Sequence, residues 1–376
     1  MTMLFSAIFN LEQTSYWLLL GWLFGMGILM NIMPKKTEIL NGRLEKRWYW
    51  FSAILLVLPY VLWAAYRPFT GDTGAYTRRF LVAPSHFEDI PNYMLTRKKD
   101  RGFELLIAVL KCLGVPNYQT MFLIFAAFQM WCMVYTFRRY SPNFWISFFL
   151  FIVSTDYISW MFNGIRQFTA VCMSFAALRL LVERKYVRFS MVILLAYTIH
   201  ASVLVMIPLA FIMQGSALNR KTLMTFVFAV LCIPFIDRFT PLLEQMLSDT
   251  QYGDVMSNEI WTFDDGTNII RVMVYSVPAI VTIFGYRYVV GSKDPVMNLC
   301  MNASIMTASV YLLSSVTSGV YVGRLPIYTT LHGYIVLPWV IDQIFEKQTA
   351  KLIKVLMIFC YLVFFYYQMH VTWEAL

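Results

Sequence analysis

Arg166 and Gln167 are the polar residues of this sequence that most need an explanation. They lie in the stretch "FNGIRQFTA", residues 162–170, between two long apolar runs. Charge is costly inside a bilayer, so ionisable residues there usually serve a function. Asn163 and Gly164 predict a turn that puts Arg166 in the first turn of the next helix, where free N–H groups favour an anion. A guanidinium also binds phosphate oxygens in pairs. The alternative is an arginine that extends to the lipid headgroups.

Other Lys and Arg residues in the sequence are candidates for the same anion site. Seven Lys and Arg residues occur between positions 67 and 103, in "RPFTGDTGAYTRRFLVAPSHFEDIPNYMLTRKKDRGF". Arg324, in "SGVYVGRLPIY", lies before a proline that opens another apolar run, and it could equally be an interfacial anchor beside two tyrosines. Several arginines without a metal motif suit a diphosphate held by protein cations alone. The predicted binding residues are Arg67, Arg78, Arg79, Arg101, Arg166, Gln167 and Arg324.

Asp72, Glu104 and His200 are the residues that could exchange protons with a substrate. Asp72 lies in a glycine-flanked turn that permits close ligand approach, although turn chemistry alone could explain it. Glu104 begins a short apolar segment, where an acid also complements the helix dipole. His200 interrupts an apolar run; it is either a packed core residue or a group of the kind that titrates near neutral pH. We predict these three as catalytic, with His200 or Asp72 as the base.

The elements that must position these residues are transmembrane helices. The 376 residues are 59% hydrophobic and 14% charged, whereas a soluble domain carries roughly a quarter charged residues. The sequence therefore predicts an all-α, polytopic membrane protein with about 10–11 transmembrane helices and a re-entrant helical hairpin. The predicted spans are 15–33, 48–66, 117–137, 143–161, 164–182, 222–240, 267–290, 296–317, 326–345 and 353–370.

Basic residues set the predicted orientation, because cytoplasmic loops collect Lys and Arg. The first loop, "PKKTEILNGRLEKR", holds five basic residues and should be cytoplasmic. If residues 187–213 crossed the membrane once, Arg220 and Lys221 would fall outside. A re-entrant hairpin with His200 at its tip keeps them inside, and we prefer it. The same rule explains the net charge of +9, which therefore does not indicate nucleic-acid binding.

This topology makes one domain of residues 1–376 with two external loops. The first, 67–116, is basic and contains a short amphipathic helix from Phe103; its positive charge outside the membrane is explained if it binds an external anion. The second, 241–266, has six acidic residues and no Lys or Arg, and we expect it to be a lid. It lacks the ligand spacing of a calcium loop. The sequence contains no cofactor or metal motif, so we expect neither.

Five short motifs resemble those of one known family. "GDTGAY", "RGFELLIAVL", "GIRQFTA", "YTIHASVLVMIPLAFI" and "GRLPIY" occur here in the order seen in EpsG-type polysaccharide polymerases, relatives of the Wzy polymerases. The resemblance runs from about residue 67 to 328, and "GIRQ" followed by the histidine segment is its most specific part. The loop 241–266 has no counterpart in that pattern. By resemblance, the matching functional positions are Asp72, Glu104, Arg166, Gln167, His200 and Arg324.

The resemblance implies a GT-C-like glycosyltransferase of the bacterial cytoplasmic (inner) membrane. Such proteins polymerise undecaprenyl diphosphate-linked, or other polyprenyl-diphosphate-linked, oligosaccharides into O-antigen, capsule or exopolysaccharide on the external face. The implied partners are that lipid-linked oligosaccharide, the lipid bilayer, and a chain-length regulator and flippase of the same pathway, with no nucleic acid. A lipid-linked glycan ligase, another polyprenyl-dependent glycosyltransferase, a flippase and an O-acyltransferase are the alternatives.

Overall fold

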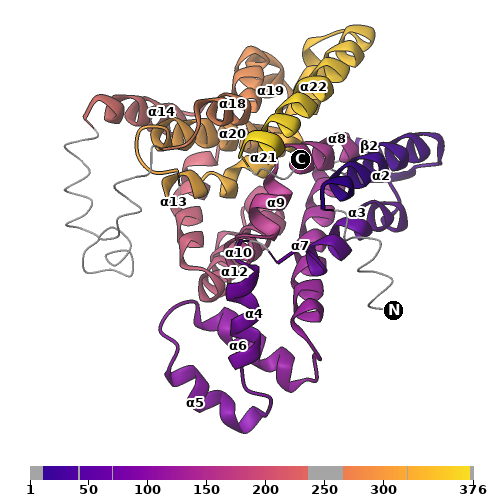
Figure 1. Ribbon diagram of the computed structural model, residues 1–376. Helices are drawn as coiled ribbons and strands as arrows, with labels where there is room; N and C mark the ends of the chain where they lie inside the picture. Colours follow the sequence, from indigo (N-terminus) through magenta and orange to yellow (C-terminus); the bar gives the residue numbers. More distant parts are fainter. Residues whose placement is uncertain (1–11, 41–42, 70, 236–265, 320, 373–376) are drawn as a thin grey trace. The chain divides into compact units, whose positions relative to one another are not determined.

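The computed structural model describes residues 12–40, 43–69, 71–235, 266–319 and 321–372 (Figure 1). These residues form helices, apart from one two-stranded hairpin. The predicted all-α class is therefore confirmed. The chain divides into two compact units, the first made of Met1–Leu204 with Leu352–Leu376 and the second of Val205–Lys351.

The first unit holds the helices that carry most of the predicted site residues. Its elements are α2 (Glu12–Ile32), β1 (Lys36–Leu40), β2 (Arg43–Arg47), α3 (Trp50–Ala65), α4 (Thr73–Val82), η1 (Phe87–Asp89), α5 (Ile90–Leu95), α6 (Arg101–Cys112), α7 (Tyr118–Tyr140), α8 (Phe144–Val153), α9 (Asp156–Met161), α10 (Ile165–Ala176), α11 (Leu178–Val182) and α12 (Tyr186–Ile199).

The second unit is arranged around α20. Its elements are α13 (Met206–Met213), α14 (Arg220–Cys232), η3 (Ile233–Phe235), α18 (Ile269–Phe284), α19 (Tyr286–Ser292), α20 (Pro295–Ser314), η4 (Val322–Arg324) and α21 (Ile327–Ile344). Helix α20 packs against α14, α18 and α21. Two elements cross the division between the units, η2 (Ala201–Val205) and α22 (Lys347–Tyr367), and η5 (Gln368–Thr372) follows α22.

Five helical segments in the described part of the chain are long and apolar enough to cross a membrane. They are Ser15–Ile32, Tyr118–Tyr140, Ile165–Val182, Pro295–Ser314 and Lys347–Val371. Helices α18 and α19 make a sixth if they count together; they are bent by 68° at their junction, as a broken span or a re-entrant loop would be. The predicted spans 48–66 and 143–161 contain shorter apolar helices, α3 and α8, and α12 in the predicted hairpin is a shorter apolar helix as well. The protein is thus a multi-pass membrane protein.

Two predicted segments are interrupted in the structure. The span predicted at 143–161 is split into α8 and α9 at Thr155, whose backbone is left-handed with φ 63°. In the segment 187–213, α12 ends at Ile199 and His200 is extended, so the helix breaks at the predicted residue. That this segment re-enters the membrane stays a prediction. Residues 241–265 of the predicted acidic lid lie outside the described residues.

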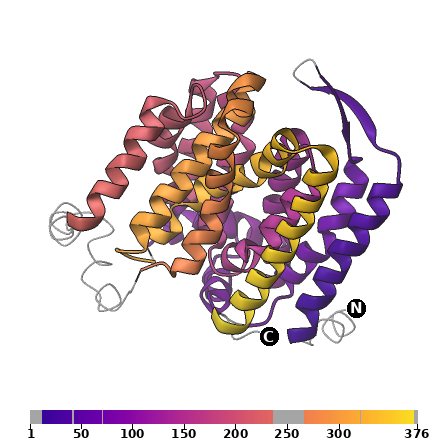
Figure 2. The ribbon, with the colours of Figure 1, turned by 90° about the horizontal axis from the view of Figure 1, so that it is seen from above.

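The hairpin of β1 and β2 was not predicted. The strands are antiparallel, Lys36 pairs with Arg47, and the hairpin extends beyond α2 and α3 (Figure 2). The sequence between them is Asn-Gly, the dipeptide most typical of a two-residue hairpin turn. The sequence therefore contains a hairpin signal, but this loop was interpreted only by its charge, as a cytoplasmic loop.

An apolar cluster holds α4 and α6 against α7 and α10. Phe103 and Ile107, one turn apart on α6, are fully buried and lie in one cluster with Tyr76 of α4, Phe125 of α7 and Ile165 of α10. The ring centroids of Phe103 and Phe125 are 5.0 Å apart. Side chains four residues apart share one face of a helix, so the "RGFELLIAVL" motif buries one face of α6. In Figure 1, α4, α5 and α6 lie together in one part of the first unit.

Gly102 permits the close approach of α6 to α12. A Cβ atom at this position would lie 2.7 Å from the carbonyl oxygen of Thr198 and would overlap the Thr198 hydroxyl. A backbone carbonyl cannot move aside as easily as the end of a flexible side chain can. The glycine of the motif is therefore explained by helix packing.

We expect Gly102→Ala to destabilise the first unit by about 1–3 kcal/mol, the usual cost of overpacking. Thermal unfolding of the purified protein measures this. Gly25→Ala is the matched control, because no atom lies within 4 Å of a Cβ placed there. Equal unfolding temperatures for Gly102→Ala and the native protein would contradict the close packing.

Candidate anion-binding and catalytic site

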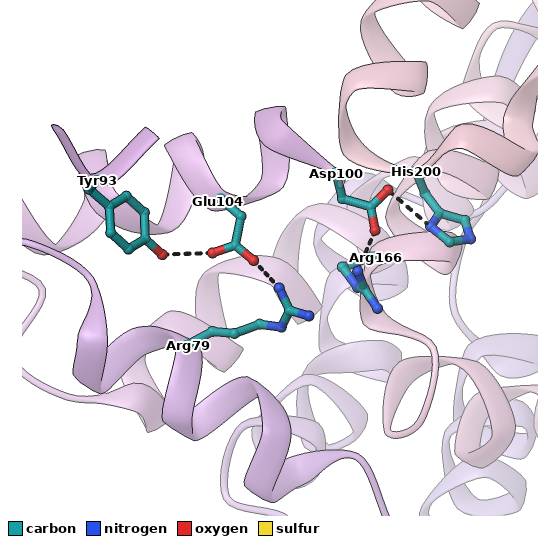
Figure 3. Close-up of polar contacts among 6 residues, drawn as sticks. All are labelled: Arg79, Tyr93, Asp100, Glu104, Arg166 and His200. Carbon is teal, nitrogen blue, oxygen red and sulfur yellow. Dashed lines mark hydrogen bonds and ion pairs between the residues drawn. The ribbon is translucent and has the colours of Figure 1, made fainter. Parts of the chain in front are cut away.

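Asp100 lies at the centre of a charged cluster in the first unit. Its Oδ2 accepts a hydrogen bond and ion pair from Nη1 of Arg166, and its Oδ1 lies 3.5 Å from Nδ1 of His200 (Figure 3). The three residues come from three segments: Asp100 precedes α6, Arg166 lies in the first turn of α10, and His200 follows α12. Helix packing thus brings Arg166 of the "GIRQ" motif and His200 of the histidine segment into contact with the same carboxylate.

The backbone at Asp100 turns its carboxylate toward these partners. Asp100 is left-handed, with φ 50° and ψ 44°, a conformation that Asp adopts more readily than most residues. It stands at the N-cap position of α6, yet its side chain makes no capping hydrogen bond. The side chain is 9% exposed and engages Arg166 and His200 instead.

The charge of Asp100 is stabilised by its neighbours. Burial by itself would raise the pKa of Asp100, but the contact with His200 and the charge of Arg166 outweigh it, and the net pKa lies below the usual 3.8. A lowered carboxyl pKa means that this contribution to stability is complete above pH 3.8 and is lost as the pH falls through the lower value. At neutral pH Asp100 is therefore an anion.

A second acid, Glu104, lies one helical turn after Asp100 and is almost fully buried, with 1% of its side chain exposed. Arg79 of α4 donates to its Oε1, and the hydroxyl of Tyr93 in α5 donates to its Oε2 at 2.6 Å (Figure 3). Burial first, and then the charge of Arg166, lower the pKa of Arg79. The two guanidiniums therefore repel one another across the cluster, and an anion would relieve that repulsion.

The predicted glycine-flanked turn contacts the segment that precedes Arg166. The N–H of Asp72 donates to Oδ1 of Asn163 at 3.3 Å, and Gly71 has φ +53° and no room for a Cβ beside Asn163. Nη1 of Arg67 donates to the carbonyl oxygens of Met161 at 2.6 Å and Phe162 at 3.2 Å. Burial lowers the pKa of Arg67 to about 10, so it remains charged at neutral pH. These bonds brace the turn that leads into α10.

Helix α7 also holds the start of α10. Nε2 of Gln129, a buried residue, donates to the carbonyl of Ile165 at 3.1 Å and to the Thr169 hydroxyl at 2.9 Å. The guanidinium of Arg166 lies 6.0 Å from the centre of the Tyr76 ring. Nε of Arg166 is buried and has no hydrogen-bond partner among the described residues. A bound oxyanion could supply the missing acceptor if it approached this edge of the guanidinium.

The structure brings together four predicted residues, Arg79, Glu104, Arg166 and His200. Asp72 is exposed at the start of α4, Arg78 and Arg101 are exposed on α4 and α6, and Gln167 is buried in α10. Arg324 is exposed in η4 of the second unit. Their roles as ligands or catalysts stay predictions. Among the described residues, no group of three or more His, Cys, Asp and Glu is placed to hold a metal ion.

Sequence reasoning missed Asp100. It is the one acid in "RKKDR", residues 97–101, directly before the "RGFE" motif. An acid inside a basic run has a local charge environment that favours its ionised form, and this signal could have identified it. The run was instead interpreted by its net charge.

We expect Glu104→Ala to destabilise the protein by about 2–3 kcal/mol, because the change leaves Arg79 and Tyr93 without their acceptor. The value is below that of a fully buried pair, since the Arg79 side chain is 31% exposed. Glu104→Gln, which keeps an acceptor for Tyr93, should cost less. Chemical unfolding measures both, with the exposed Glu88→Ala as control; equal losses for Glu104→Ala and Glu88→Ala would refute the pairing.

Comparison with known proteins identifies a family for most of the chain. No curated protein and no solved structure matches this sequence. The family model described as "EpsG family" matches residues 48–374, which include every residue of the charged cluster. The match confirms the resemblance of the short motifs, and the chain belongs to the EpsG family.

Proposed function

We propose that this protein polymerises polyprenyl-diphosphate-linked oligosaccharide repeat units into surface polysaccharide. EpsG-family membrane proteins are linked to exopolysaccharide synthesis, and polymerisation is the finer activity we infer. The observation that carries the proposal is the contact of Arg166 and His200 with the same carboxylate, Asp100, beside Arg79. These groups combine binding of a diphosphate with a base, which are the two requirements of the reaction.

The reaction transfers the growing glycan from its diphosphate carrier to a hydroxyl of an incoming lipid-linked unit. The acceptor oxygen forms a bond to the anomeric carbon, and the bond from that carbon to the diphosphate oxygen breaks. The acceptor proton passes to a protein base, and the polyprenyl diphosphate leaves as an anion. The site must therefore stabilise growing negative charge at one end and accept a proton at the other.

Arg166 and Arg79 are suited to the leaving diphosphate. Cations held in place before the reaction stabilise charge that develops in the transition state, and this is usually the largest contribution to catalysis. Asp100 holds Arg166 by Nη1, and Glu104 holds Arg79 by Nη1, so both guanidiniums are oriented. The start of α10 adds the partial positive charge of a helix N-terminus.

His200 is the base we favour over Asp72. Nδ1 of His200 faces the ionised Asp100, which favours the tautomer with its proton on Nδ1 and leaves Nε2 to accept the acceptor proton. The negative carboxylate then stabilises the imidazolium that forms. Asp72, in contrast, lies at the start of α4, where its side chain is exposed.

The setting of this proposal is the bacterial cytoplasmic membrane with the site on its external face. The basic segment 67–103 would then meet lipid-linked units after a flippase delivers them, and a chain-length regulator would act on the product. This orientation rests on the distribution of basic residues along the sequence.

We expect Arg166→Ala to lower the polymerisation rate by about 10²–10³-fold, the usual effect of removing one donor to a transition-state anion. Purified protein is supplied with its lipid-linked repeat units, and the products are separated on a gel as a ladder. Arg79→Ala should shorten the ladder as well. Arg188→Ala, which removes an exposed arginine from the first turn of α12, should leave it unchanged. A full ladder from a folded Arg166→Ala protein would reduce this arginine to a structural anchor.

The base is tested by His200→Gln, for which we expect a loss of about 10²–10⁴-fold in rate, the range of general base catalysis. Asp100→Asn should lose less, because the imidazole remains but its tautomer and its neighbouring charge are no longer controlled. Single-turnover rates at saturating lipid-linked unit separate these chemical effects from binding. If His200→Gln keeps the native rate and Asp72→Asn does not, the base is Asp72.

The same assay separates polymerisation from its rivals. A ligase would attach a preformed glycan to a different acceptor and give no ladder from repeat units alone. A flippase would move the units across a vesicle membrane without changing their length. Absence of a ladder from folded native protein on its own repeat unit would overturn the proposal.

A further inference from the structure

A second group of cations surrounds a cavity at the base of the β1–β2 hairpin in the first unit. The cavity has a volume of about 50 Å³, and Lys35, Lys46, Arg47 and Arg138 line it together with Asn143 and Phe144 at the start of α8. No acid lines it. One water needs roughly 10–15 Å³ of such space, so the cavity has room for several waters or one tetrahedral oxyanion.

The helix start on the cavity wall adds to its positive potential. Asn143 caps α8 by accepting from the N–H of Ile146 at 3.2 Å. The first N–H groups of a helix have no partner within the helix, and they carry its partial positive charge. Cations and a helix N-terminus therefore line the same small space, which is the arrangement of an anion site.

The arginines of this group are buried, and among the described side chains one carboxylate, that of Glu38, pairs with the group. Arg47 and Arg138 are 5% and 6% exposed. Nη1 of Arg47 donates to the carbonyl of Arg138, and Nη2 of Arg138 pairs with Glu38 at 2.8 Å. Glu38 also pairs with Lys36 at 3.3 Å, so this one carboxylate serves two cations. The exposed Lys35 and Lys46 complete the rim of the cavity.

The surroundings of the cavity are those of a membrane surface. It lies where α2 ends at Ile32, α3 begins at Trp50, and α7 ends just before α8, and α2 and α7 contain candidate membrane spans. Beside it in the sequence, the side chains of Ile32 and Phe51 are 80% and 75% exposed. Cations next to exposed apolar side chains match a phospholipid, whose headgroup phosphate adjoins its acyl chains.

We propose that this cavity binds the phosphate group of an anionic phospholipid in the cytoplasmic leaflet. The leaflet follows from the basic first loop, and the inference does not depend on the polymerase proposal. A soluble phosphate compound shares the headgroup chemistry, but the exposed apolar side chains beside the cavity favour the lipid.

The test is the thermal unfolding midpoint of the delipidated, detergent-purified protein, titrated with dioleoyl phosphatidylglycerol, dioleoyl phosphatidylcholine or inorganic phosphate. Phosphatidylglycerol should raise the midpoint more than either of the others. The double variant Lys35→Ala/Lys46→Ala should weaken the apparent affinity for phosphatidylglycerol by about tenfold or more. Both lysines are exposed, so folding is preserved. The control, Lys347→Ala/Lys351→Ala, removes two exposed lysines from α22 and should respond as the native protein does.

Each other result overturns part of the proposal. Equal stabilisation by inorganic phosphate and by phosphatidylglycerol would assign the cavity to a soluble phosphate compound instead of a lipid. An unchanged phosphatidylglycerol affinity in Lys35→Ala/Lys46→Ala would show that the lipid binds elsewhere. Equal shifts of the unfolding midpoint by phosphatidylglycerol and phosphatidylcholine would show that the site does not distinguish an anionic headgroup from a zwitterionic one.

Discussion

The contact of Asp100 with Arg166 and His200 is the interaction on which the rest of the candidate site depends. It joins the starts of α6 and α10 to the end of α12, segments far apart in the sequence. A partly buried ion pair is favourable only while its partners stay in place, since removing one leaves the other charge unsatisfied. The close approach at Gly102 and the apolar cluster around Phe103 therefore do more than fill space. They keep three helices at the separation that the charges require.

Around this contact the cations are held in different ways that suit different tasks. Arg67 is buried and bonded to backbone carbonyls, so it braces the turn before α10. Arg79 and Arg166 are each paired with one acid and remain partly exposed, which keeps them oriented and within reach of a substrate. An arginine that donates one nitrogen to the protein still has others for phosphate oxygens. This division is what electrostatic preorganisation of a diphosphate site demands.

The two clusters of cations in the first unit follow one chemical logic on different elements. In each, at least one arginine is paired with a carboxylate and a helix begins beside it. The cluster at Asp100 adds a histidine, which makes proton transfer feasible. The cluster at Arg138 has no histidine among the described residues that line its cavity, and it suits binding alone.

The sequence by itself determined the membrane-spanning helical class, the family, and most of the charged residues that meet. A long apolar segment in lipid forms a helix, because its backbone N–H and C=O groups must be hydrogen-bonded within the segment. The sequence alone could not determine which charges pair. Asp100 and Arg166 are 66 residues apart along the chain, and Arg166 and His200 are 34 residues apart. Helix packing alone decided that Asp100, hidden in a basic run, became the shared partner. Packing also made Arg67 a brace, because its guanidinium is buried against carbonyl groups that no pattern in the sequence places beside it.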